Sequence, residues 1–153
     1  MNHAATHLES MSHIDALPAE EALRAMVVAQ CDAASAVTPA ISDIETAARS
    51  VADALQRGAT LHYAAAGSSG LMALADACEL PGTFQVPQAQ IKVHMAGGVP
   101  ADGVMPGDTE DSTDDAVRAV ADVAPDDVAI VISASGTTPY ALAFASAARE
   151  KGA

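Results

Sequence analysis

Apolar residues recur at helical spacing through the first third of the chain, and they predict two helices over residues 18–35 and 38–57. Pro18 and the acidic Glu20 and Glu21 suit the first turn and the positive end of the first helix. The apolar stripes consist of Leu23, Met26, Val27, Cys31 and Ala34 in the first helix and of Ile41, Ile44, Ala48, Val51 and Leu55 in the second. A striped helical pair of this kind needs a surface to cover it.

The pattern changes at Gly58, after which short apolar runs replace the long stripes. The predicted strands lie at residues 60–65, 91–96 and 127–132, and the predicted helices that follow them at 71–78, 114–123 and 139–151. Strands that alternate with helices indicate an α/β fold, with a doubly wound parallel sheet and right-handed crossovers. Three parallel strands leave a hydrophobic edge uncovered, so we expect the sheet to be incomplete in this chain.

These patterns divide the 153-residue chain into three parts. Residues 1–16 are polar and are predicted to form a flexible arm, residues 17–57 form the helical segment, and residues 58–153 form the α/β domain. Within that domain, residues 99–112 are rich in proline, glycine and aspartate and are predicted to be a loop.

Two of the predicted strand-to-helix turns are rich in glycine and hydroxyl residues. In an open α/β sheet, ligands bind beyond the carboxyl ends of the strands, where backbone N–H groups and helix N-termini can hold a phosphate. Each hydroxyl could instead be a simple helix cap, but two such turns at one end of adjacent strands favour a ligand site. The candidate phosphate-binding residues are Gly67, Ser68 and Ser69 in the first turn and Ser133, Ser135, Gly136, Thr137 and Thr138 in the second.

Charge and composition narrow the classes of partner. The net charge of −13 argues against binding to nucleic acid or to anionic membranes, although backbone N–H groups can still bind a small anion. No apolar run approaches the ~20 residues of a membrane span and no signal pattern begins the chain, so we expect a cytoplasmic location. Cys31 and Cys78 have neither disulfide nor zinc spacing and are expected to be buried. The strand residues His62 and His94 are expected to be core or edge residues rather than catalysts.

The second turn, Ser133 to Thr138, resembles the hallmark of SIS (sugar isomerase) domains, which bind phosphosugars, and residues 67–70 resemble their first sugar-phosphate loop. A narrower resemblance is to the N-acetylmuramic acid 6-phosphate etherase family. It rests on four segments, which agree with that family in order and approximate spacing: residues 76–84, 96–98, 109–111 and 134–140. The resemblance covers essentially the whole chain but only about the first half of a family member.

The resemblance implies an SIS-type, flavodoxin-like sheet and a carbon–oxygen lyase. Enzymes of this family eliminate D-lactate from C3 of N-acetylmuramic acid 6-phosphate, and water addition then yields N-acetylglucosamine 6-phosphate. The family's two catalytic glutamates fall on Glu79, which would be the acid, and on Glu110, which would be the base. The resemblance implies no metal or organic cofactor. It also implies a homodimer, in which the helical segment is a plausible interface element.

The residues themselves leave these roles open. Glu79 follows the apolar stretch 71–78 and is expected at the end of a mostly buried helix, with an exposed helix end as the alternative. Glu110 lies in an acidic run and, taken alone, is expected to be a solvated loop charge. Leu71 and Thr137 stand where the etherase family usually has arginine. The competing hypotheses are a non-catalytic phosphosugar-binding SIS regulatory module, an inactive remnant, and an aldose–ketose isomerase.

Overall fold

The computed structural model describes residues 13–153. Most of the predicted flexible arm lies outside the described residues. The chain divides into two compact units, Met1–Ala47 and Ala48–Ala153, and the boundary falls within one continuous helix, α3 (Ile41–Gln56).

The first unit is helical, as the apolar stripes predict. A single turn of 3-10 helix, η1 (Ile14–Ala16), precedes the long helix α2 (Ala19–Ala36), and a second short turn, η2 (Thr38–Ala40), leads into α3. Helix α2 buries none of its side chains within the chain. Its apolar stripe is exposed, and so are Ile41 and Ile44 at the start of α3. Cys31 is exposed for the same reason, so the expectation that it is buried was wrong.

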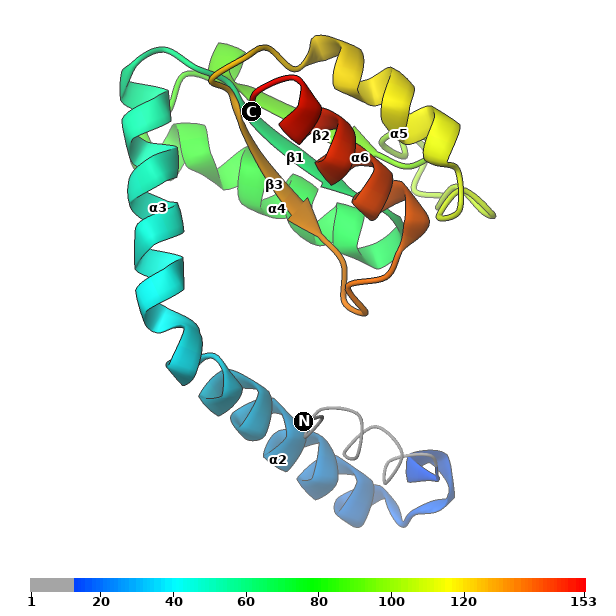
Figure 1. Ribbon diagram of the computed structural model, residues 1–153. Coiled ribbons are helices and arrows are strands. Elements are labelled where there is room, and N and C mark those ends of the chain that lie inside the picture. The colour runs from blue at the N-terminus through cyan, green and yellow to red at the C-terminus, as the bar shows by residue number, and fades with distance from the viewer. Residues whose placement is uncertain (1–12) are drawn as a thin grey trace. The chain divides into compact units, whose positions relative to one another are not determined.

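The second unit contains a parallel three-stranded sheet with the strand order β2-β1-β3. Its strands are β1 (Leu61–Ala65), β2 (Ile91–Met95) and β3 (Val128–Ile132), and Leu61 of the central strand is aligned with Ile91 on one side and Val128 on the other. Helix α4 (Gly67–Phe84) packs on one face, and helices α5 (Thr113–Ala119) and α6 (Pro139–Glu150) cover the other (Figure 1). The predicted doubly wound parallel sheet is therefore confirmed, and the sheet is open at both edges.

Alternation along β1 separates two cores, one on each face of the sheet. Leu61, Tyr63 and Ala65 pack against α4 and the last turns of α3, whereas Ala64 packs against α5 and α6 around Phe144. Many of these contacts are made by alanines, so the helices can approach the sheet closely. The Tyr63 hydroxyl donates a hydrogen bond to the carboxylate of Asp76, which joins the central strand to α4.

Helix α4 is longer than predicted in both directions. It begins directly after β1, at Gly67, and it continues past Pro81 to Phe84, where the left-handed Gln85 ends it. Proline lacks an N–H and disfavours helix interiors, which is why residues 71–78 alone were expected to be helical. The longer helix puts Cys78 on a solvent-facing side of α4, so the expectation that this cysteine is buried was also wrong.

No helix among residues 13–153 is both long enough and apolar enough to cross a membrane.

Candidate functional site

The two glycine- and hydroxyl-rich turns lie at the same edge of the sheet. The first follows β1 and opens α4, and the second follows β3 and opens α6. Because β1 and β3 are paired in parallel, with Ala65 beside Ile132 at their last residues, the turns that leave them are neighbours at the carboxyl edge. This is the edge at which open α/β sheets bind ligands.

The first turn is the bare N-terminus of α4. Its N-cap is Ala66, which offers no capping side chain, and the helix begins with Gly67 in a left-handed conformation at φ 55°. Ser68 is exposed and Ser69 is half-buried, and neither serine caps the helix. The capping interpretation therefore fails for these two hydroxyls. The N–H groups of a first helical turn have no partner within the helix, so this end can receive an anion.

Gly70 closes the first turn onto the next strand. A Cβ atom at this position would lie 2.8 Å from Cγ and 2.9 Å from Sδ of Met95, the last residue of β2. Glycine thus lets the start of α4 pack directly on β2. The contact between Gly70 and Met95 thus helps to fix the position of the first turn relative to β2.

Hydroxyl groups of the second turn hold one another in place. The Ser133 Oγ atom accepts a hydrogen bond from the Gly136 N–H at 3.0 Å and pairs with Thr138 Oγ1 at 2.9 Å. The Ser135 Oγ atom accepts hydrogen bonds from both the N–H and the hydroxyl of Thr137, at 3.1 and 2.9 Å. Thr138 is the N-cap residue of α6, yet its hydroxyl is turned to Ser133 instead of capping the helix. The turn is therefore ordered by its own hydroxyls.

Glu110 contacts both the first turn and the start of α6, the helix that follows the second turn. Its backbone carbonyl accepts a hydrogen bond of 3.0 Å from the N–H of Tyr140, in the first turn of α6. Its carboxylate lies against Gly67, where a Cβ atom would collide with Glu110 Oε1. Glu110 is exposed, as expected of a loop charge, but the loop holds it in one place beside the two turns.

The loop that carries Glu110 is anchored at the end of β2. The Thr109 hydroxyl donates to the Ala96 carbonyl at 3.2 Å, and the Gly97 N–H donates to Asp115 Oδ2 at 3.3 Å. Gly97, at φ 76°, also leaves room for Pro106 and Thr109, both of which a side chain at this position would overlap. These anchors were not predicted from the sequence, although the Gly97-Gly98 pair is the signal that marks them.

Glu79 lies apart from the two turns and Glu110. It lies inside α4 rather than at its end, it is exposed, and its Oε2 atom accepts a 3.1 Å hydrogen bond from the hydroxyl of Thr83, one helical turn later. The partly buried surroundings expected for Glu79 are therefore absent, because α4 continues past it and turns this side chain to solvent. Within the described residues, the turns and Glu110 come together and Glu79 stands apart from them.

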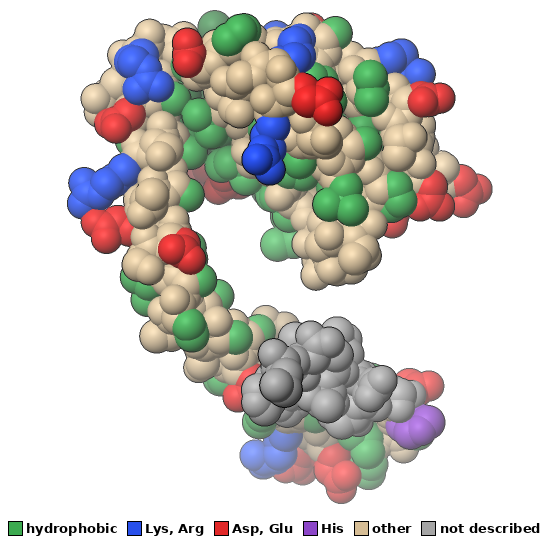
Figure 2. Space-filling model, viewed as in Figure 1, with side chains coloured by type: hydrophobic (Ala, Val, Ile, Leu, Met, Phe, Trp, Pro, Cys, Tyr) green, Lys and Arg blue, Asp and Glu red, His purple; other side chains and the backbone are tan. Residues whose placement is uncertain are grey.

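The carboxyl edge is poor in cations. The segments 66–71, 96–112 and 133–140 contain no lysine or arginine. Leu71 is exposed, and the Thr137 hydroxyl is engaged with Ser135. Acidic side chains instead gather at the end of the second unit formed by the loop at residues 99–112 (Figure 2). An anion at this edge would thus be held by N–H groups, hydroxyls and helix N-termini rather than by a counter-charge.

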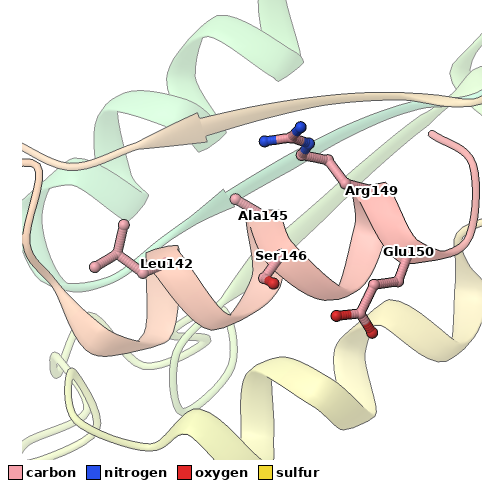
Figure 3. A pocket seen from close by; sticks show the side chains of 5 residues that line it. All are labelled: Leu142, Ala145, Ser146, Arg149 and Glu150. Atoms are coloured by element: carbon pink, nitrogen blue, oxygen red, sulfur yellow. The ribbon is translucent and has the colours of Figure 1, made fainter.

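A shallow groove of about 500 Å³ lies away from the turns, along the outer side of α6. Its lining residues project from one side of the helix (Figure 3): Leu142, Ala145, Ser146, Arg149 and Glu150. Arg149 also lines a neighbouring hollow with Ala129 and Val131 of the edge strand β3. Among residues 13–153, no group of three or more histidine, cysteine, aspartate or glutamate side chains is arranged to hold a metal ion.

Comparisons with known proteins agree with this geometry. Residues 30–153 match the SIS domain family. The chain is 35% identical over 145 residues to an N-acetylmuramic acid 6-phosphate etherase of Streptomyces avermitilis, covering 94% of this chain and 47% of the relative. It is 34% identical over 157 residues to the etherase of Geobacillus thermodenitrificans, covering 100% and 53% of the two chains.

A third relative, the N-acetylmuramic acid 6-phosphate etherase of Thermobifida fusca, is 34% identical over 149 residues, which cover 94% of this chain and 47% of the relative. The chain therefore spans about half the length of the curated relatives it matches. The family match takes in both hydroxyl-rich turns and the loop of Glu110. By its sequence and by its open parallel sheet, this chain belongs to the SIS domain family.

Proposed function

We propose that this chain supplies the phosphosugar-binding edge of a carbon–oxygen lyase that cleaves the D-lactyl ether of N-acetylmuramic acid 6-phosphate. The products are N-acetylglucosamine 6-phosphate and lactate. The observation that carries the proposal is the position of Glu110, whose carboxylate lies against Gly67 of the first turn and whose carbonyl accepts the Tyr140 N–H at the start of α6, the helix that the second turn opens. The names of the relatives supply the substrate and the reaction.

In this proposal the phosphate of the sugar binds between the two turns. The N–H groups at the start of α4 and the hydroxyls of Ser68 and Ser69 contact it from one side, and the Ser133–Thr138 turn contacts it from the other. When the phosphate binds, hydroxyls of the second turn that are paired with one another, such as those of Ser133 and Thr138, form a hydrogen bond to a phosphate oxygen in place of that pairing. A turn already ordered by its own hydrogen bonds loses little conformational freedom in this step.

The chemistry needs a base at C2 and an acid at the leaving oxygen. Glu110 takes the C2 proton, the C3–O bond breaks with its electron pair on the lactate oxygen, and Glu79 donates a proton to that oxygen. Water then adds across the C2–C3 double bond, with a hydroxyl at C3 and a proton at C2, which restores both carboxyl groups to their starting states. Glu110 beside the turns suits the first role.

Because Glu79 is exposed and contacts neither turn, we propose that it reaches the substrate at an interface with a second copy of the chain. Helix α4, which carries Glu79, exposes the large apolar side chains of Leu71, Met72 and Phe84. The first unit exposes a further apolar stripe along α2, with Leu23 and Val27 each 63% exposed. Burial of such surfaces drives association, so a homodimer is the arrangement that these helices favour.

The second candidate is a non-catalytic module that binds a phosphosugar and regulates a partner. It is favoured by the exposed Leu71 and by Thr137, which stand where the etherase family usually has arginine. The binding turns do not depend on either position having a positive charge, since N–H groups and hydroxyls supply their donors. Binding without turnover would identify this function.

Lactate release from N-acetylmuramic acid 6-phosphate tests the lyase proposal. We expect release by the wild-type chain, its loss in Glu79→Gln and in Glu110→Gln, and unchanged release in Glu150→Gln, an exposed glutamate at the end of α6. A wild-type chain that binds the phosphosugar, shown by a rise in its thermal midpoint, but releases no lactate would instead establish the regulatory module. If the chain neither binds the phosphosugar nor releases lactate, both the lyase proposal and the regulatory-module proposal are refuted.

A further inference from the structure

A second cluster of titratable side chains lies on the face of the sheet covered by α5 and α6. His62 of β1 is fully buried, with 0% of its surface exposed. Its Nδ1 atom lies 2.9 Å from Nε2 of His94 in β2, and its Nε2 atom lies 3.1 Å from Oδ2 of Asp127, the residue before β3. The three side chains form one hydrogen-bonded chain that crosses all three strands.

The hydrogen-bond partners of Asp127 determine which nitrogen atoms of His62 and His94 carry the protons. Its Oδ1 atom accepts the Thr60 N–H and its Oδ2 atom accepts the Ala124 N–H, both at 2.8 Å, so the carboxylate is used as an acceptor on both oxygens. His62 must then donate from Nε2 to Asp127, and its Nδ1 atom must accept from Nε2 of His94. This arrangement satisfies every member of the chain with both imidazoles neutral.

The surroundings contain few other charges that face the pair. From β2, Lys92 forms an ion pair of 3.5 Å with Asp122 of the short helix η4 (Val120–Asp122), so these two opposite charges largely offset each other at the histidines. From α6, Phe144 packs on the His94 ring with centroids 5.1 Å apart. Tyr140 belongs to the same buried cluster, and burial raises its pKa to about 12, so it stays neutral.

The two imidazoles can together accept only one extra proton without breaking their contact. Their ring planes are 14° from parallel with centroids 5.2 Å apart, and a single proton fits between Nδ1 and Nε2. With two extra protons, N–H groups of two cations would face each other across 2.9 Å, with the His62 cation fully buried and the His94 cation partly buried. Burial lowers the pKa of His62, an effect that Asp127 partly opposes, and burial and His62 together lower the pKa of His94 to about 4.

We propose that the His62–His94–Asp127 chain is an acid-sensitive latch, which joins the three strands to α6 at neutral pH and opens when both histidines become protonated. Opening separates the imidazoles and removes His94 from its place against Phe144. Because Phe144 lies on the helix that begins at the Ser133–Thr138 turn, the opened latch loosens the base of that turn. The device stands on the buried contacts alone and does not depend on the proposed lyase function.

Thermal unfolding of the full chain between pH 7.5 and pH 5 tests the latch. We expect the wild-type thermal midpoint to fall by roughly 5–10 °C over this interval, because His62 and His94 bind protons more weakly in the folded chain than in the unfolded chain. His94→Leu should lower the midpoint at pH 7.5 but show about half the fall between the two pH values. His13→Gln is the matched control, since His13 is exposed, and it should keep the wild-type fall. An equal fall in His94→Leu and wild type would overturn the proposal.

A direct measurement decides the matter even where His94→Leu fails to fold. In wild-type protein with 15N-labelled histidine, the rings of His62 and His94 should remain neutral at pH 5.5, with the proton on Nε2. Positively charged rings of both His62 and His94 at pH 5.5, with the protein still folded, would refute the latch.

Discussion

Replacing Gly67 by alanine should destabilise the fold in two ways, through its backbone conformation and through an overlap with Glu110. Gly67 has a left-handed backbone at φ 55°, which costs an alanine about 1–2 kcal/mol. A methyl group here would also overlap Glu110 Oε1, the tip of an exposed side chain. Since that side chain can move aside, we expect the overlap to add only about 1 kcal/mol, typical of the coupling between touching residues. Gly67→Ala should therefore lower the free energy of unfolding by about 2–3 kcal/mol.

Two companion variants make this prediction sharp. Gly58 has φ 89°, and a methyl group added there would have nothing within 4 Å, so Gly58→Ala should show the backbone cost alone. In a Glu110→Ala background the overlap at Gly67 disappears, so the cost of Gly67→Ala should fall to that of Gly58→Ala. The measurement is urea unfolding of the four proteins of the double-mutant cycle. A cost at Gly67 that is the same with and without Glu110 would refute the placement of this carboxylate against the first turn.

Three further predictions concern the sheet and the second turn. Gly70→Ala should cost about 1–3 kcal/mol of unfolding free energy, because its methyl group would lie 2.8 Å from Met95 Cγ, and Met95→Ala should restore part of that loss in chemical denaturation. Ser133→Ala should lower stability by only about 1 kcal/mol, since it removes the hydrogen bonds to Gly136 and Thr138, but it should abolish the thermal shift caused by a phosphosugar. Because the pKa of His94 is lowered to about 4, the free energy of unfolding should be highest above pH 6.5 and should decrease by at most about 3 kcal/mol as the pH falls towards 4, because the unfolded chain binds the proton more readily; urea unfolding at a series of pH values measures this decrease.

The architecture was predictable from the sequence because it follows from local apolar patterns. The stripe from Leu23 to Ala34 predicts α2, and the continuous apolar run before Ser133 predicts β3. Strands that alternate with helices in this way predict a parallel, doubly wound sheet. The length of α4 was not predictable in the same way, because Pro81 in a late turn of the helix resembles a terminator.

The candidate site was only partly predictable. The two turns follow from their composition, since glycine and hydroxyl residues directly after strands are typical of phosphate-binding edges. The contact between Glu110 and the first turn depends on a loop whose anchors, Thr109 to Ala96 and the Glu110 carbonyl to Tyr140, join residues 13 and 30 positions apart. No local pattern encodes such a pairing. The same holds for Asp127, which is 65 residues from His62 and offers no signal in the sequence that it binds a buried imidazole.

Whether the two turns form one phosphosugar site is tested most directly by an NMR titration of the 15N-labelled chain with N-acetylglucosamine 6-phosphate. Unphosphorylated N-acetylglucosamine serves as the control. We predict that the amide resonances of residues 67–70 and 133–140 shift together with a single binding constant, and that the control sugar leaves them in place. Shifts confined to one turn, or equal shifts with the control sugar, would contradict a shared site.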